Sequence, residues 1–148
     1  MLSALALAVA AVLTVGSARY YFGPYQESRV YGSFNAEVST SIGYYMQRLG
    51  PDWKQYFIGA PRMWAEFGSA TFIARNPYYD VVEPLTAPPT FVDPAYNAAF
   101  IILPERMQEL LYIQQAYPNG RLDEAHRDGK ADEPLLFYVY VVETKSAG

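Results

Sequence analysis

The sequence of 148 residues contains no cysteine and a single histidine, His126. The lack of cysteine excludes disulfides, thiolate catalysis and cysteine-ligated zinc or iron–sulfur centres, and a single histidine excludes a metal site built from several histidines. The GxSxG, GxxxxGK(S/T) and GxGxxG patterns of hydrolases, phosphate-binding loops and dinucleotide-binding folds do not occur either. We therefore expect no metal ion and no cofactor.

Acidic residues outnumber basic residues in the sequence. The chain has 11 Lys and Arg against 15 Asp and Glu, which gives a formal net charge of −4. Proteins bind nucleic acid mainly through a basic field, because phosphate contacts release condensed counterions. We therefore expect no nucleic-acid partner.

Ionisable and aromatic side chains are both missing from the first segment, Met1–Ala18. As a helix it would be roughly 27 Å long, enough to cross the hydrocarbon core of a bilayer. The segment predicts one N-terminal transmembrane helix over residues 1–18. The alternatives are a cleaved signal peptide, which would lack the usual basic start, and an ordinary buried helix.

The residues that follow are typical of a membrane interface. They lie in an aromatic juxtamembrane linker predicted over residues 19–32, and residues 33–148 then form a soluble domain. Arg19, the nearest charge, by itself favours a cytoplasmic location for the C-terminal side. The predicted interface residues are Arg19, Tyr20, Tyr21, Phe22 and Tyr25.

The soluble part alternates between helical and strand-like patterns. Helices between the first three predicted strands imply a parallel sheet with right-handed crossovers. The prediction is an α/β fold: a three-layer open sheet, mostly parallel, with a C-terminal antiparallel hairpin at its edge. The predicted elements are a helix over 33–49, a strand over 53–59, a helix over 63–74, a strand over 80–85, a strand over 98–104, a helix from Pro104, and hairpin strands in RLDEAHR and LLFYVYVVE.

The candidate ligand site is GAPRMW, residues Gly59–Trp64, directly after the first predicted strand. In open parallel sheets, ligands bind beyond the carboxyl ends of the strands and near helix N-termini. Gly59, Arg62 and Trp64 are the predicted ligand-binding residues, with Arg62 holding a phosphate or carboxylate and Trp64 stacking on a sugar ring. The alternative is that Arg62 is a surface charge and Trp64 a core residue.

Acidic residues also gather around His126, at Asp123–Glu124, Asp128 and Asp132–Glu133. Such oxygens bind calcium or serve as acid and base. Their spacing lacks the calcium-loop repeat, and DGKADEP has the composition of a turn, so we interpret them as a solvated hairpin tip. A stand-alone hydrolase that uses these carboxylates with His126 is the minor alternative.

Several segments together carry a resemblance to a known family: RYYFGPYQ after the apolar helix, YFIGAPRMW, FIILPERMQELLYIQQAYPNG and the closing LLFYVYVV. The chain resembles the C-terminal region of bacterial polytopic glycosyltransferases of the dolichyl-phosphate-mannose protein mannosyltransferase type. In that family, many membrane helices are followed by a small soluble domain outside the cytoplasm. Arg19 runs against this topology.

The resemblance implies a division of labour. The family's catalytic acidic residues lie in extracytoplasmic loops near its N-terminus, and its lipid-linked donor binds in the membrane part; neither region is present here. We therefore expect no catalytic residue in this chain. We expect the chain to be a fragment or detached relative of such an enzyme that assists acceptor binding or loop positioning. Its expected partners are the bilayer, the remaining membrane helices of a glycosyltransferase, and a glycan or glycolipid. The alternative is a secreted or single-pass module that binds glycans or small anions.

Overall fold

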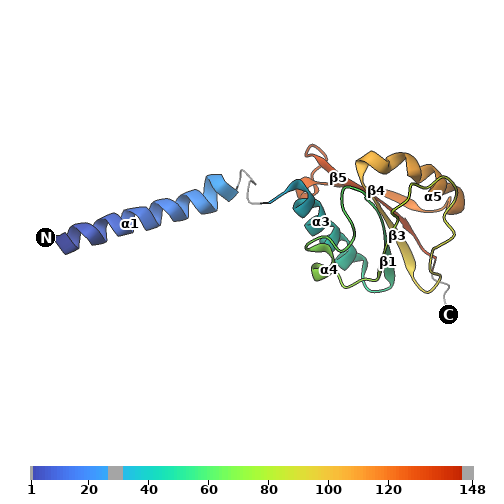
Figure 1. Ribbon diagram of the computed structural model, residues 1–148, viewed down its shortest axis with the longest axis horizontal. Helices are drawn as coiled ribbons and strands as arrows, with labels where there is room; N and C mark the ends of the chain where they lie inside the picture. The colour runs from blue at the N-terminus through green and yellow to red at the C-terminus, as the bar shows by residue number, and fades with distance from the viewer. Residues whose placement is uncertain (1, 27–31, 145–148) are drawn as a thin grey trace. The chain divides into compact units, whose positions relative to one another are not determined.

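The computed structural model describes residues 2–26 and 32–144 (Figure 1). The chain divides into two compact units, Met1–Phe34 and Asn35–Gly148. The first unit is helical and the second is an α/β domain.

The first unit is built on α1, Leu2–Tyr20, and a π-helical turn, η1, Tyr21–Tyr25. The 22 residues Ala4–Tyr25 have a mean hydropathy of 1.5, and none of this stretch is buried. At 1.5 Å per residue the stretch is about 33 Å long, so it is long and apolar enough to span a membrane. The core helix of a soluble protein, by contrast, is mostly buried, whereas a signal sequence near the N-terminus has the same length and apolar character.

The aromatic residues after Ala18 continue the helix, so the first part of the predicted linker is helical. Gly23, at φ −118° and ψ −105°, departs from helical geometry, and Pro24, which has no N–H to donate, follows it, so the chain is kinked within η1. The rings of Tyr21 and Tyr25 stack with their centroids 5.4 Å apart, and Phe22 packs edge-on against Tyr21 at 5.1 Å. The predicted interface residues therefore form a collar at one end of the apolar helix.

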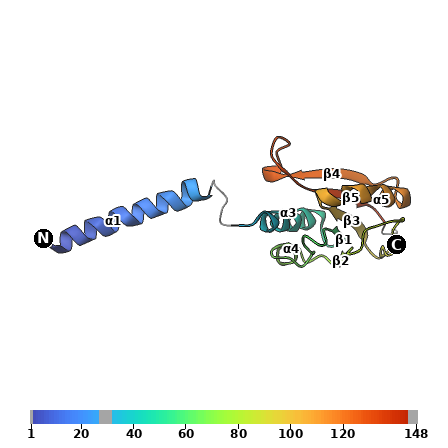
Figure 2. The same ribbon diagram turned by 45° about the horizontal axis from the view of Figure 1, so that its top comes forward.

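The second unit contains a five-stranded sheet in the order β2-β1-β3-β5-β4 (Figure 2). Strand β1 pairs in parallel with both β2 and β3, whereas β5 is antiparallel to both β3 and β4. Four strands thus point the same way and β5 opposes them. The strands are β1 Trp53–Ile58, β2 Tyr78–Asp80, β3 Asn97–Ile102, β4 Arg121–His126 and β5 Leu135–Val142.

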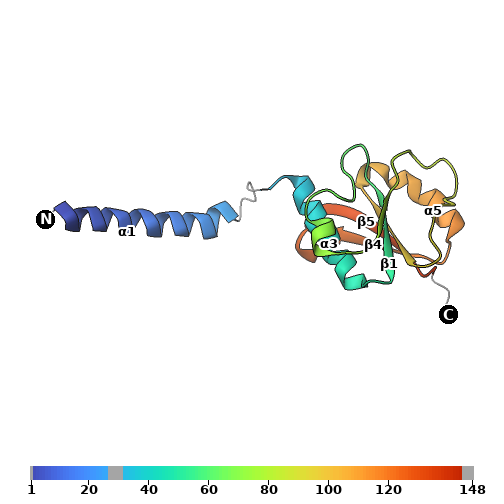
Figure 3. The same cartoon turned by 60° about the horizontal axis from the view of Figure 1, so that its bottom comes forward.

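Helices cover both faces of this sheet (Figures 1 and 3). On one face lie α3, Phe34–Leu49, and the short α4, Ala70–Ile73; on the other lies α5, Leu110–Ala116, preceded by a 3₁₀ turn, η2, Pro104–Glu109. Side chains alternate between the faces along each strand and form two apolar cores. The α3 core contains Val38, Ile42, Met46, Phe57, Ile101 and Val139, and the α5 core contains Tyr56, Phe100, Ile102, Leu110, Ile113 and Tyr140.

The predicted α/β fold is confirmed, including the mostly parallel sheet and the C-terminal antiparallel hairpin. Three details differ. The hairpin contributes only β4 to the edge, because β5 lies between β3 and β4. Strand β2 is Tyr78–Asp80 and ends where the predicted strand over 80–85 was to begin. The helix expected from Pro104 starts as the 3₁₀ turn.

The helix predicted over 63–74 was wrong over most of its length, because only Ala70–Ile73 is helical. Side chains from elsewhere in the fold bind the backbone of this segment. Asp80 accepts a hydrogen bond from the amide of Ala65 at 2.8 Å, and the Ser39 hydroxyl accepts one from the amide of Ala70 at 3.0 Å. Gly68 adopts φ +59°, a left-handed conformation that interrupts a right-handed helix.

Candidate functional site

The predicted site segment lies where the sequence pattern placed it, at the carboxyl end of β1. Its backbone turns sharply, because the amides of Arg62 and Met63 both donate to the carbonyl of Gly59, at 3.0 and 3.2 Å. Gly59 is required by close packing: a Cβ built there would lie 2.4 Å from the ring of Phe57. The structure therefore gives Gly59 a packing role at the start of the turn.

Arg62 reaches across the sheet edge to two other elements. Its Nε donates to Oδ1 of Asn35, in the first turn of α3, at 2.8 Å, and its guanidinium contacts both carboxylate oxygens of Glu105, after β3, at 3.2 Å. The side chain is 28% exposed and that of Glu105 is 43% exposed. A phosphate or carboxylate ligand of Arg62 would have to compete with Glu105 or displace it, so this carboxylate lowers the affinity of the site for anions.

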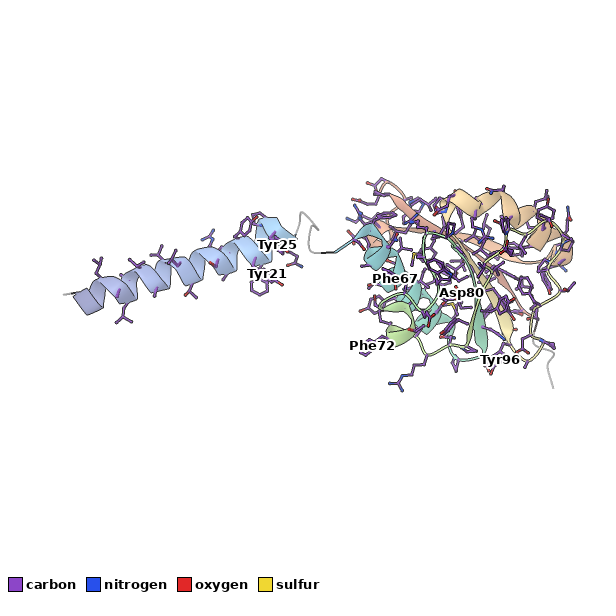
Figure 4. All side chains as sticks on the ribbon, viewed as in Figure 1. Tyr21, Tyr25, Phe67, Phe72, Asp80 and Tyr96 are labelled. Carbon is purple, nitrogen blue, oxygen red and sulfur yellow. The ribbon has the colours of Figure 1, made fainter. Side chains whose placement is uncertain are left out.

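Trp64 is not a core residue, because 42% of its surface is exposed. The residues on either side of it, Met63 and Ala65, are buried and fix the backbone between them. Asp80 at the end of β2 adds the hydrogen bond to the amide of Ala65 (Figure 4). Burial raises the pKa of Asp80, and that hydrogen bond opposes the rise. Part of Trp64 is thus in contact with solvent, while the residues on either side of it are buried.

A buried ion pair that the sequence patterns did not single out contacts the turn that carries Arg62. Arg106 and Glu109, both in η2, contact each other at 2.5 Å between Nε and Oε1, and at 2.7 Å between a second guanidinium nitrogen and Oε2. Both side chains are almost fully buried, at 7% and 4% exposed. Their spacing of three residues after a buried strand is the signal that sequence reasoning passed over.

This ion pair joins the loops that follow β1 and β2. The Arg106 guanidinium donates to the carbonyls of Val81 at 2.7 Å and Glu83 at 3.1 Å, while Glu109 accepts the amide of Leu85 at 2.8 Å. The Arg106 guanidinium also donates to the carbonyl of Ala60 at 3.4 Å, inside the turn that carries Arg62 and Trp64. Arg106 and Glu109 therefore position the site segment.

The acidic residues near His126 are dispersed into separate contacts. The His126 ring bonds the carbonyl of Glu133 through Nδ1 at 2.8 Å and the carboxylate of Glu124 through Nε2 at 3.1 Å. The bond to Glu133 and the bond to Glu124 both raise the pKa of His126. Within residues 2–26 and 32–144, no group of three or more His, Asp or Glu side chains is placed to hold a metal ion.

Asp123 is drawn away from this group toward α3. It accepts a hydrogen bond from the hydroxyl of Tyr45 at 2.6 Å and contacts Arg121 at 3.0 Å. Burial and the hydrogen bond to Asp123 both raise the pKa of Tyr45. The hydroxyl therefore stays protonated and joins β4 to α3, which is a structural role.

A concave region lies at the opposite end of β1, where Trp53 begins the strand. It is a groove of about 530 Å³ with a mixed polar and apolar lining. Arg121, one of its charged residues, is already paired with Asp123. The lining residues are Leu49, Trp53, Asn119, Arg121, Val141, Val142 and Glu143.

Comparison of the chain with protein-family models, with curated proteins and with solved structures finds no match. The resemblance to glycosyltransferases therefore stays a prediction.

Proposed function

We propose that the chain is a membrane-anchored, non-catalytic domain that lies outside the cytoplasm. In this proposal it serves a membrane glycosyltransferase with a lipid-linked sugar donor, by assisting acceptor binding or by positioning loops. The observation that carries the proposal is the exposed apolar helix Ala4–Tyr25 with its aromatic collar, joined in one chain to a folded α/β domain. The resemblance described above supplies the link to glycosyl transfer.

The charges at the sheet edge support an assisting role. Arg62 is held by Asn35 and Glu105, and Arg106 is held by Glu109 and by backbone carbonyls. Contacts of this kind shape a surface for a partner or an acceptor. In the proposal the chemistry is supplied by the membrane part of the glycosyltransferase, and this domain contributes binding.

Membrane insertion is tested by alkaline extraction of membranes that contain the full chain. Replacing Leu7 and Val12 by Arg places two charges in the apolar helix, at a cost of about 2.5–3.5 kcal/mol each at a helix centre. We expect this variant to move to the soluble fraction while the unchanged chain stays with the membrane. Leu122→Arg, on the exposed edge strand β4, is the matched control and should remain membrane-bound. A double variant that stays in the membrane would contradict the anchor.

Sidedness can be read with an introduced thiol, because the chain has no cysteine of its own. Ala131→Cys, at the exposed tip of the β4–β5 hairpin, should react with a membrane-impermeant maleimide in intact spheroplasts. Labelling only after permeabilisation would place the domain in the cytoplasm and overturn this part of the proposal.

The link to glycosyl transfer is tested by reading the genomic frame upstream of Met1. We expect membrane helices and an acidic extracytoplasmic loop there. In the longer polypeptide, deleting residues 33–148 should reduce transfer to the acceptor and leave binding of the lipid-linked donor intact. Unchanged transfer to the acceptor after the deletion would refute an assisting role.

A second candidate function, a glycan-binding module, is favoured by one observation: Trp64 is half-exposed two residues from Arg62. An exposed indole is a suitable platform for the apolar face of a sugar ring. A glycan array probed with the full chain in nanodiscs should show binding that is lost in Trp64→Ala and Arg62→Ala and kept in Leu122→Ala. Array signals equal in all three variants would exclude this site.

A further inference from the structure

Three large aromatic side chains are exposed within one short segment of the domain, Trp64, Phe67 and Phe72, which we call the aromatic surface. Phe72, on α4, is 85% exposed, an unusual value for phenylalanine in a folded domain. Figure 4 shows Phe67 and Phe72 on the α3–α4 side of the sheet, with the Phe72 ring directed away from the ribbon. Apolar side chains that gather on a surface mark contacts with proteins or membranes.

The segment that carries these aromatics is fastened along α3, from Ser39 to Gln47. The hydroxyl of Ser39 donates to the carbonyl of Phe67, and the hydroxyls of Thr40 and Ser69 are 2.6 Å apart. The amide of Ala70 donates to Ser39 at 3.0 Å. These contacts satisfy backbone polar groups of the segment from within the domain, which lowers the cost of moving it out of water.

The attachment also places the aromatic surface beside α3, the first helix of the domain after the apolar helix in the sequence. Helix α3 begins at Phe34, itself 44% exposed, and only residues 26–33 separate it from Tyr25, the last collar residue. The nine Cα–Cα steps from Tyr25 to Phe34 reach at most about 32 Å. If α1 crosses a bilayer, the start of α3 is therefore confined to the neighbourhood of the membrane surface.

Charge in the segment suits an interfacial position. Between Trp64 and Phe72 the only ionisable side chain is that of Glu66, and Arg62 and Arg75 flank the segment. Tryptophan and other amphipathic aromatic side chains favour the boundary between headgroups and acyl chains. The short connection to α1 favours lipid as the occupant over a second copy of the chain, because lipid is at hand for every anchored molecule.

We propose that the aromatic surface, Trp64, Phe67 and Phe72, rests in the interfacial layer of the bilayer that α1 crosses. This inference rests on the membrane anchor of the proposed function and adds a second point of contact to it.

The two tryptophans allow a direct test. They lie at opposite ends of β1, and each can report alone: Trp53→Phe leaves Trp64, and Trp64→Phe leaves Trp53. The full chain is reconstituted in phosphatidylcholine vesicles whose acyl chains are brominated close to the headgroup. Because interfacial side chains reach about 5–10 Å into this region, we expect Trp64 fluorescence to be quenched at least about twofold more than that of Trp53. Equal quenching of the two would overturn the inference.

Matched surface variants identify the side chains responsible. Phe67→Ser with Phe72→Ser should reduce the quenching of Trp64, whereas Leu111→Ser, an exposed residue of α5 on the opposite face, should not. Circular dichroism shows whether each variant keeps the fold. Unchanged quenching in the folded double serine variant overturns the inference, as does cross-linking into a dimer through Phe72→Cys without quenching of Trp64.

Vesicle flotation separates the two proposals. If the chain does not float with the vesicles, the membrane anchor fails and the inference fails with it. If the chain floats and Trp64 is quenched no more than Trp53, the anchor stands and the aromatic surface alone is refuted.

Discussion

Two arginines at the same edge of the sheet are held in different ways. Arg62, after β1, is partly exposed and contacts one carboxylate and one amide side chain, those of Glu105 and Asn35. Arg106, after β3, is buried and contacts Glu109 together with several backbone carbonyls. Arg62 therefore links side chains at the protein surface, whereas Arg106 links buried backbone carbonyls of neighbouring loops.

This difference indicates which of the two arginines is available to bind a ligand. A ligand can replace Glu105 at Arg62, because both side chains are in contact with water and the pair contributes little to folding. No ligand can replace the carbonyls at Arg106 without opening the loops that they belong to. We therefore propose that Arg62 takes part in recognition and that Arg106 positions the loops, and two predictions test these roles.

The largest effect is expected from breaking the buried pair. Arg106→Leu leaves the Glu109 carboxylate buried without its partner, and loss of one member of such a pair costs about 3–5 kcal/mol. We expect the free energy of unfolding to fall by that amount in urea titrations of the full chain in detergent micelles. Replacing both residues, Arg106→Leu with Glu109→Leu, should recover much of the loss, because no unpaired charge remains. A single variant as stable as the unchanged chain would contradict the positioning role.

A smaller effect is expected at the exposed pair. Arg62→Gln should lower the free energy of unfolding by at most about 1 kcal/mol, because the ion pair is partly hydrated. Glu105→Gln removes the competing carboxylate, so inorganic phosphate should bind Arg62 more tightly in this variant, as measured by calorimetry. Lys130→Gln, an exposed change on the hairpin, is the control and should leave phosphate binding as it is. A loss of phosphate affinity in Glu105→Gln would reverse our assignment.

The smallest effect extends the comparison to a partly exposed contact away from the sheet edge, between His126 and Glu124. The pKa of His126 is raised above its ordinary value of 6.5, first by its bond to the Glu133 carbonyl and then by Glu124. A pKa raised by folding stabilises the protein below pH 6.5, and this contribution disappears as the pH rises through the folded-state pKa. Because His126 is the only histidine, its NMR titration is unambiguous. We expect Glu124→Gln to move the midpoint toward 6.5, and a midpoint at or below 6.5 in the unchanged chain would contradict the structure.

Local patterns predicted the parts of the fold in which local and tertiary preferences agree. Helix α3 has apolar residues at helical spacing, and β3 is a continuous apolar run buried on both faces, so periodicity alone sufficed for both. Residues 63–69 have a helical pattern as well, but Asp80 and Ser39 bind the segment's backbone in another conformation. Those partners are distant in sequence, and no pattern within the segment reveals them.

The candidate site was predicted in position and only partly in composition. The rule that ligands bind beyond the carboxyl ends of parallel strands located Arg62 and Trp64 at the sheet edge. It did not reveal that Glu105 pairs with Arg62, because that contact joins two loops across the sheet. It also missed Arg106 and Glu109, whose buried pairing depends on how three loops meet.

The place of β5 inside the sheet has a consequence for biosynthesis. Strand β4 pairs only with β5, and β3 has no partner on that side until β5 arrives. A ribosome must therefore translate through Val142 before the sheet can close, by which time the apolar helix has long since left the exit tunnel. In the proposed membrane-anchored arrangement, insertion of the apolar helix therefore precedes folding of the α/β domain.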